Sequence, residues 1–156
     1  MSRRISDVSV DSLLLEARGL SGDFDILSQT VAERVGLSTT ELLAMDLISR
    51  GGAVTAGQLA THLHLTTGAI TGLIDRLERA GYAKRRSDKA DRRRVLVVST
   101  PRGDRIGALF GPLGGALRQA TRGYSAQELA TLIDFVKRLR SAVAMTSEGI
   151  RAEKDR

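Results

Sequence analysis

Five residues of one short charged segment are the first candidates for binding chemistry. Lys89, Asp91, Arg92, Arg93 and Arg94 lie between a basic run and an apolar run rich in β-branched residues. Arginine offers a planar fork of N–H donors to phosphate, and at the tip of a β-ribbon it can enter a narrow DNA minor groove. A carboxylate would repel a polyanion, so Asp91 needs another role. We interpret it as an ion-pair partner that holds the Arg93 guanidinium in one pose. A solvated charged turn without a partner is the alternative interpretation.

The distribution of charge favours a polyanionic partner for this segment. The chain of 156 residues carries 24 Lys or Arg, 18 Asp or Glu and a formal net charge of +6. Residues 82–105 alone hold nine basic and three acidic residues, which is the same net excess. The remainder is therefore close to neutral, and a localised basic patch on a neutral body is typical of nucleic-acid binding.

A second group of candidates precedes the basic segment, on one face of an expected helix. Ile70, Leu73, Ile74 and Leu77 are spaced i, i+3, i+4, i+7, which predicts an amphipathic helix ending at about Arg79. The start and the opposite face of this helix carry Thr66, Thr67, Ala69, Thr71, Gly72 and Arg76. Small side chains let a backbone approach DNA, threonine can bond a base edge, and the distant arginine favours phosphate. Ordinary solvated positions on a packed helix are the alternative.

Other kinds of chemistry find little support. The chain has no cysteine, which excludes disulfides, thiolate metal ligands and thiol redox sensing in these residues. His62 and His64, the only histidines, diverge at i, i+2 spacing on a helix, so we expect no metal site and no cofactor. No catalytic constellation is recognisable, and we expect no enzyme. No apolar run is long enough for a membrane helix and no secretion signal is evident, so a cytoplasmic location is expected.

The two groups of candidates are positioned by short, well-punctuated elements. Ser38-x-x-Glu41 and Thr55-x-x-Gln58 are capping boxes, which predict helices through about Arg50 and over 56–62. The helix with the small polar face follows a short turn and ends at about Arg79, where Gly81 is the stop signal. Strands are expected over 82–86 and 94–100, on either side of the charged segment. Helix, turn, helix and ribbon in this order place the second helix in a major groove.

Longer amphipathic helices flank this central part. Apolar residues at steps of four and three from Leu13 to Val31 predict a helix over 10–35, with a break possible at Gly19 or Gly22. Pro101 suits the first turn of another helix, in which the run Gly111–Gly115 predicts a kink. A third capping box, Ser125-x-x-Glu128, opens a final long helix.

The central segment resembles the MarR (multiple antibiotic resistance regulator) family. The similarity covers "LTTGAITGLIDRLERAGYAKRRSDKADRRRVLVVSTPRG", Leu65–Gly103, and the flanking helices extend it over nearly the whole chain. It depends on "LIDRLERAGY", on "DRR" at the turn and on the strand ending "STPRG". The resemblance implies a mainly α fold with a small β-hairpin. A single domain, 1–156, would hold a winged helix-turn-helix lobe at 38–100 and dimerisation helices at 8–35 and 101–150.

The resemblance also implies a function and partners. A homodimer would place two recognition helices on a pseudo-palindromic operator in double-stranded DNA, as a repressor that a small, often aromatic, ligand releases. It assigns Arg93 to the minor groove and Asp91 to its orientation. The ligand site is unknown, since Phe24, Met45 and Phe110 suit a pocket or plain core. Two departures, Asp88-Lys89 in place of Asp-Pro and Gly72 in place of a larger polar residue, favour shape readout over direct base readout.

Two other functions remain open from the sequence. A low-specificity architectural protein would use the same lobe and basic patch but recognise only the charge and shape of DNA. A ligand-binding or protein-interaction module would retain the winged lobe as a vestige.

Overall fold

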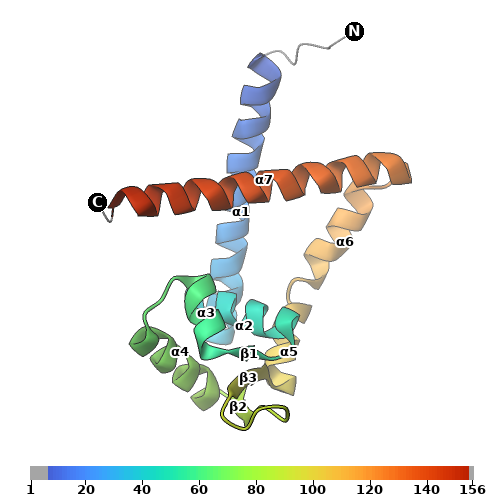
Figure 1. Cartoon of the computed structure of the whole chain (residues 1–156). Helices are drawn as coiled ribbons and strands as arrows, with labels where there is room; N and C mark the ends of the chain where they lie inside the picture. Colours follow the sequence, from blue (N-terminus) through green and yellow to red (C-terminus); the bar gives the residue numbers. More distant parts are fainter. Residues whose placement is uncertain (1–6, 155–156) are drawn as a thin grey trace. The chain divides into compact units, whose positions relative to one another are not determined.

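The computed structural model describes residues 7–154, which form two compact units with their boundary between Phe110 and Gly111. The ends of the expected 1–156 domain, residues 1–6 and 155–156, lie outside the described residues. The first unit contains α1 (Asp7–Val35), α2 (Thr39–Gly51), β1 (Val54–Thr55), α3 (Ala56–Leu63), α4 (Thr67–Arg79), β2 (Ala83–Ser87), β3 (Val95–Ser99) and α5 (Pro101–Ala108) (Figure 1). The second unit contains α6 (Gly111–Ala120) and α7 (Ala126–Lys154).

The helices begin where the capping boxes predict. The Ser38 Oγ accepts from the Glu41 N–H at 3.2 Å, and the Glu41 carboxylate accepts from the Ser38 N–H at 2.8 Å. Thr55 and Gln58 repeat this reciprocal pair at the start of α3. Each box satisfies N–H groups that a helix start would otherwise leave without partners. A third box at Ser125 precedes α7 in the same way.

The small sheet has one strand more than the predicted hairpin. Strands β2 and β3 pair antiparallel with Arg85 opposite Val97, and β1 pairs antiparallel with the outer side of β3, giving the order β1-β3-β2. The two residues of β1, Val54 and Thr55, are too few to show an alternating pattern. Its pairing with residues 96 and 97 is also distant in sequence, which explains why the strand was missed.

The core of the first unit gathers one face of each of its elements. The four apolar residues predicted to face inward from α4 are each at most 2% exposed, which confirms that pattern. They pack in one cluster with Met45, Ile48, Leu59 and Val97. Gly103 shows how closely α5 joins this cluster, since a Cβ there would lie 2.2 Å from the Tyr82 carbonyl oxygen. The core therefore fixes one face of α4 and leaves the other exposed.

Two expectations for the flanking helices were wrong. No break occurs at Gly19 or Gly22, and α1 continues to Val35, where Gly36 with φ of +70° ends it. The expected single kinked helix after Pro101 is two helices, α5 and α6, which are separated at residues 109–110. Within residues 7–154, no helix is long and apolar enough to span a membrane.

Candidate nucleic-acid interface

The recognition-helix candidates lie at the capped start and on the exposed side of α4. Thr66 is the N-cap, and its Oγ1 accepts a 3.3 Å hydrogen bond from the Ala69 N–H. Thr67 opens the helix, and Gly72 lies one turn further, half-buried. The other proposed contact residues on this helix are exposed: Thr66, Thr67, Ala69, Thr71 and Arg76. The structure thus brings all six sequence candidates to one helix, with the small residues in its first two turns.

Two glycines leave gaps between the side chains on this side of α4. A Cβ placed on Gly68 would meet nothing within 4 Å, and one on Gly72 would meet only the Arg76 side chain at 3.7 Å. Packing within the chain therefore does not require glycine at either position. Their absence of side chains instead leaves room for another molecule to approach the helix backbone closely.

Thr71 has its hydroxyl proton engaged within the helix. Its Oγ1 donates to the Thr67 carbonyl oxygen at 2.8 Å, one turn earlier. The oxygen lone pairs and the methyl group remain on the exposed side. In this rotamer Thr71 is suited to accept from a cytosine or adenine amino group, or to contact a thymine methyl, more than to donate.

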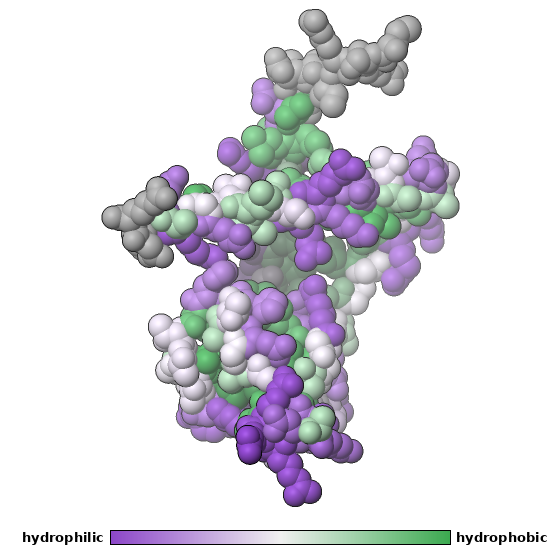
Figure 2. All heavy atoms as spheres, viewed as in Figure 1, coloured by the Kyte–Doolittle hydropathy of each residue, from purple (hydrophilic) through white to green (hydrophobic). Residues whose placement is uncertain are grey.

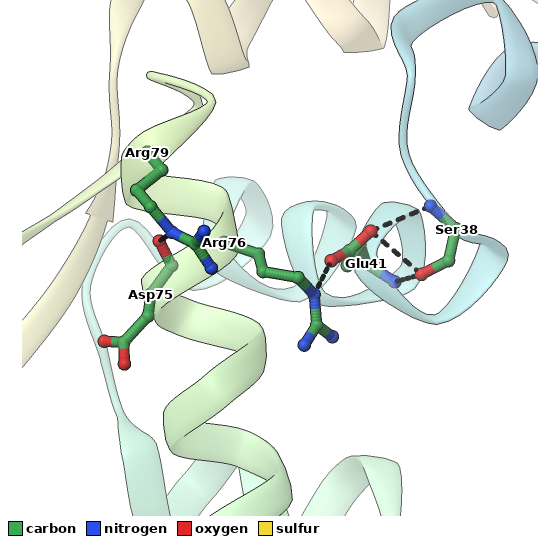
Figure 3. A network of polar contacts seen from close by, with 5 residues as sticks. All are labelled: Ser38, Glu41, Asp75, Arg76 and Arg79. Carbon is green, nitrogen blue, oxygen red and sulfur yellow. Dashed lines mark hydrogen bonds and ion pairs between the residues drawn. The ribbon is translucent and has the colours of Figure 1, made fainter.

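Arg76 is held by the start of α2, as Figure 3 shows. Its Nε lies 2.6 Å from Oε1 of Glu41, the carboxylate that also closes the capping box with Ser38. The Glu41 side chain is 9% exposed and that of Arg76 is 55% exposed, so the carboxylate is inside and the guanidinium tips reach the surface. Arg76 therefore links α4 to α2, and its expected phosphate contact stays a prediction.

This contact also sets the ionisation of Glu41. Partial burial raises the pKa of the carboxyl. Hydrogen bonds from the Ser38 N–H, the Arg76 guanidinium and the Ser38 hydroxyl lower this pKa, as does the Arg76 charge, and together they outweigh the burial. The net result is a pKa below the ordinary value of 4.5. The charged form is thus the one that the fold stabilises.

Asp91 does not hold the Arg93 guanidinium in the way that we expected. Its Oδ1 accepts a 3.0 Å hydrogen bond from the backbone N–H of Arg93, and no ion pair joins the two side chains in the described chain. Asp88 does the same for the N–H of Ala90 at 2.9 Å. An aspartate that bonds the backbone two residues later is a common device for shaping turns. Asp91 therefore fixes the backbone from which Arg93 projects.

The turn between β2 and β3 presents some of its basic residues without acidic partners. The Arg94 guanidinium lies 3.8 Å from the Asp88 carboxylate, so part of its charge is offset. Lys89, Arg92 and Arg93 are exposed, and none of them forms an ion pair among residues 7–154. These three are the wing candidates best placed to meet an external anion.

Arg85 is a functional candidate that the sequence did not single out. Its guanidinium pairs with Asp75 at 2.8 Å and with Glu78, both on α4, and its N–H donates to Glu78 at 2.6 Å. Partial burial lowers the pKa of Arg85, but the hydrogen bonds and charges of the two carboxylates raise it above its ordinary value. We call these three residues the Arg85 clamp. It ties the wing strand β2 directly to α4.

Lys84 and Arg86 were also missed, because they alternate with Arg85 along β2. Successive side chains of a strand point to opposite faces, so these two lie on the face away from the clamp. Both are exposed, and Figure 2 shows strongly hydrophilic side chains over this end of the first unit. With the register of β2 known, its alternation would have separated Arg85, which contacts α4, from Lys84 and Arg86, which face solvent.

The remaining candidates from the sequence are placed as follows. Met45 is buried in the core, Phe110 packs against it and Phe24 is exposed, so they do not line one site. The His62 Nδ1 lies 2.8 Å from the Gln58 carbonyl oxygen of its own helix. In the described residues, no group of three or more His, Cys, Asp or Glu is placed to hold a metal ion.

Comparison with known proteins relates this geometry to transcription regulators. The sequence model described as "MarR family" matches residues 37–95, which span α2 to the first residue of β3. An uncharacterized HTH-type transcriptional regulator, YcgE of Bacillus subtilis (strain 168), is 39% identical over 112 residues, covering 71% of this chain and 73% of YcgE. The transcriptional activatory protein BadR of Rhodopseudomonas palustris is 29% identical over 124 residues, covering 72% and 71% of the two chains.

Solved structures show the same fold at lower identity. A MarR family protein from Bacillus stearothermophilus superposes with a TM-score of 0.68 at 18% identity, covering 90% of this chain and 99% of the other. The similarity therefore extends well beyond the helix-turn-helix to the long helices on either side.

Proposed function

Since this chain belongs to the MarR family of DNA-binding transcription regulators, we propose that it is a sequence-specific repressor that acts as a homodimer in the cytoplasm. Its target is a pseudo-palindromic operator in double-stranded DNA, and a small ligand releases it. Thr66, Thr67, Ala69, Thr71 and Gly72 face the bases in this proposal. Arg93 enters the minor groove, and Lys89, Arg92, Arg94 and Arg76 contact phosphates.

One observation supports the DNA-binding surface above the others. The Arg85 clamp joins α4, whose exposed side carries small residues, to the wing. The tip of the wing carries Arg92 and Arg93, which have no acidic partner in the described chain. A small-residue helix face suits a major groove and an arginine at a ribbon tip suits a narrow minor groove. The two surfaces are thus available to a single duplex at once.

Homodimer formation is supported by apolar residues that the single chain leaves exposed. Leu13 and Leu20, on the predicted seam of α1, are 47% and 57% exposed. Figure 2 shows hydrophobic residues on the surface of α1. The second unit likewise exposes Leu132, Ile133 and Val136. Exposed apolar residues repeated along a helix are typical of an interface, and two-fold symmetry would explain an inverted repeat in the operator.

Selection of duplexes from a random pool tests whether binding is sequence-specific. We expect an inverted repeat whose half-sites are about one helical turn apart, bound at least about a thousandfold more tightly than random duplex. A ratio near one would favour the architectural alternative. Failure to bind any duplex, together with tight binding of a small aromatic compound, would favour the ligand-binding module.

Arg93→Ala tests the wing directly. Loss of the minor-groove arginine should weaken binding of the selected duplex at least about tenfold at physiological salt, without unfolding the protein. Arg138→Ala is the matched control, since Arg138 is an exposed arginine of the second unit whose one ion pair among the described residues is with Asp134, one turn before. Equal affinities of the two variants would refute the wing assignment.

Repression is the part of the proposed function that a transcription assay tests. BadR, which is similar to this chain, is named as an activatory protein. Whether a bound regulator blocks or recruits polymerase depends on where the operator lies. Transcription from the promoter next to the selected inverted repeat, with and without the protein, distinguishes repression from activation.

A further inference from the structure

Glu41 of α2 carries a buried charge that its place in the helix cap does not require. Among residues 10–153 it is the one charged residue that is buried, at 7% exposed. Its carboxylate closes the capping box of α2, but Gln58 closes the box of α3 with the same reciprocal contacts and without a charge. A buried charge costs free energy that an uncharged amide would avoid. The cap alone therefore does not explain why this residue is a glutamate.

The two oxygens of the Glu41 carboxylate have separate partners. Oε2 accepts from the Ser38 N–H at 2.8 Å and from the Ser38 hydroxyl at 3.0 Å. Oε1 accepts from the Arg76 Nε–H at 2.6 Å, across 35 residues of sequence. Neither Glu41 nor Arg76 forms another ion pair in the described chain. One oxygen thus serves the cap, and the other is directed at a single guanidinium of α4.

This contact leaves the outer part of the Arg76 guanidinium available to another molecule. Glu41 uses the Nε–H, so the N–H donors on both Nη atoms remain, and the Arg76 side chain is 55% exposed. Figure 3 shows the Nη atoms directed away from the carboxylate. Nη1 lies beside Gly72, 3.7 Å from the position that a Cβ there would occupy. The guanidinium therefore extends back along α4, toward the turns that carry the proposed base contacts.

We propose that Glu41 is a positioning residue for DNA binding, which holds Arg76 in the pose in which its Nη groups donate to a phosphate beside the base contacts of α4. An arginine that is fixed before binding loses less side-chain entropy when it bonds an anion. The inference rests on the proposed function, in which Arg76 contacts phosphate, and it adds the residue that directs this contact.

Stability alone is a weak explanation for this ion pair. Replacing both members of a buried ion pair by well-packed uncharged residues is often neutral for stability, because desolvation offsets their attraction. The effect on geometry is harder to replace, since a long arginine side chain without an acceptor samples several rotamers. A carboxylate that accepts from Nε restricts these rotamers and leaves the charge of the guanidinium at the surface.

The positioning role predicts the opposite sign from simple electrostatics. A carboxylate close to a DNA-binding surface repels phosphate, so its removal should tighten binding if charge alone acts. Loss of a carboxylate that positions Arg76 should weaken binding instead. The direction of the change in affinity therefore separates the two accounts.

The test compares Glu41→Gln with Glu128→Gln in the full chain. Glutamine keeps an oxygen for the cap of α2, as Gln58 does in α3, but places an amide N–H where Arg76 needs an acceptor. Glu128 is the matched control, because its carboxylate accepts the same two contacts from Ser125 and forms no ion pair in the described chain. Fluorescence anisotropy with the selected duplex, over a series of salt concentrations, gives the affinity and its salt slope.

We expect Glu41→Gln to weaken binding about fivefold and to reduce the slope of log affinity against log salt by about one, since one phosphate contact is lost. Glu128→Gln should leave both quantities unchanged. In an Arg76→Gln background, Glu41→Gln should have no further effect, because the residue through which it acts is gone. The slope is independent of the active fraction of protein, so partial unfolding of a variant does not imitate its change.

Unchanged or tighter binding by Glu41→Gln would overturn the inference. Weaker binding with an undiminished salt slope would also overturn it, by assigning Glu41 a structural role only, and so would a full effect in the Arg76→Gln background. Ser38→Ala, which removes the cap hydroxyl but leaves Oε1 to Arg76, should retain the slope, and an equal loss would assign the effect to the cap. A wild type that binds no duplex would refute the proposed function as well, whereas specific wild-type binding with an unaffected Glu41→Gln variant would refute this inference alone.

Discussion

Asp91 acts on the backbone of the wing turn, two residues before the arginine that it was expected to bind by its side chain. Its Oδ1 accepts from the Arg93 N–H, and the Arg94 N–H donates to its carbonyl oxygen, each at 2.9–3.0 Å. The sequence identified the correct residue but not its contact, because an Asp-x-Arg spacing is compatible with a side-chain or a backbone acceptor. At the residue scale, Asp91 therefore stabilises the conformation of the turn and does not bind the Arg93 side chain.

Asp91→Asn and Asp91→Ala separate these two roles. Asparagine keeps an oxygen that can accept from the Arg93 N–H but cannot form an ion pair, whereas alanine loses both. We expect Asn to retain DNA affinity to within about twofold and Ala to lose about fivefold, since a turn hydrogen bond contributes about 1 kcal/mol. Anisotropy titrations measure both, and equal losses for the two variants would restore the ion-pair interpretation.

Glu41 predicts a specific dependence of stability on pH. Its pKa is lowered in the folded chain, so its contribution is present above the unfolded value near 4.5 and is lost as the pH falls through the lower folded value. Glu41→Gln should cost about 1 kcal/mol at neutral pH, because the Arg76 ion pair is lost while the capping oxygen remains. It should also flatten the loss of stability below pH 4.5. Denaturant unfolding from neutral to acidic pH measures this, and parallel curves for variant and wild type would contradict it.

At the scale of elements, the Arg85 clamp ties the wing to α4, the two parts of the proposed recognition surface. Asp75→Asn with Glu78→Gln tests this against a purely electrostatic account. Removing two negative charges beside DNA should tighten binding if charge alone matters. The clamp predicts weaker binding instead, by several-fold, because β2 is no longer held to α4. Anisotropy titrations decide the sign, and tighter binding would contradict the clamp.

A second measurement tests whether the clamp determines where Arg93 lies relative to α4. In the unclamped background, Arg93→Ala should cost less affinity than in the wild type, since the wing no longer aims Arg93 at one place. Such non-additivity is expected for coupled residues. Fully additive effects would mean that the wing and α4 bind DNA independently.

Local signals explain which elements were predictable from sequence. The capping boxes of Ser38 and Thr55 involve residues three positions apart, so a short segment of sequence is enough to predict the start of each helix. The contact of Arg76 with Glu41 spans 35 residues, and β1 pairs across about forty. Nothing in either segment alone indicates its partner. The candidate residues of the interface were therefore found by type and period, but the contacts that fix them were not.

At the scale of the whole molecule, the basic patch contributes less free charge than its composition suggests. Of the nine basic residues between 82 and 105, Arg85 and Arg94 have carboxylate partners. The other seven are exposed and form no ion pair in the described chain: Lys84, Arg86, Lys89, Arg92, Arg93, Arg102 and Arg105. Net charge predicted the partner class correctly, and we expect the unpaired residues of the wing, Lys84, Arg86, Lys89, Arg92 and Arg93, to decide the salt dependence of binding.

Self-association should depend on the exposed seam of α1. Leu20→Glu with Phe24→Glu places two charges in the proposed interface and should shift the protein to monomers, as measured by equilibrium sedimentation. Leu15→Glu is the control, because Leu15 is 70% exposed but about half a turn away from the seam. Unchanged self-association of the seam variant would place the interface elsewhere.

The most direct test of two recognition units acting on one operator is an anisotropy titration of the selected inverted repeat against the same duplex with one half-site scrambled. We predict two chains per intact duplex and an affinity at least about a hundredfold lower for the scrambled one, since one α4 and one wing then lose their base and groove contacts. Equal affinity for the two duplexes would contradict the account.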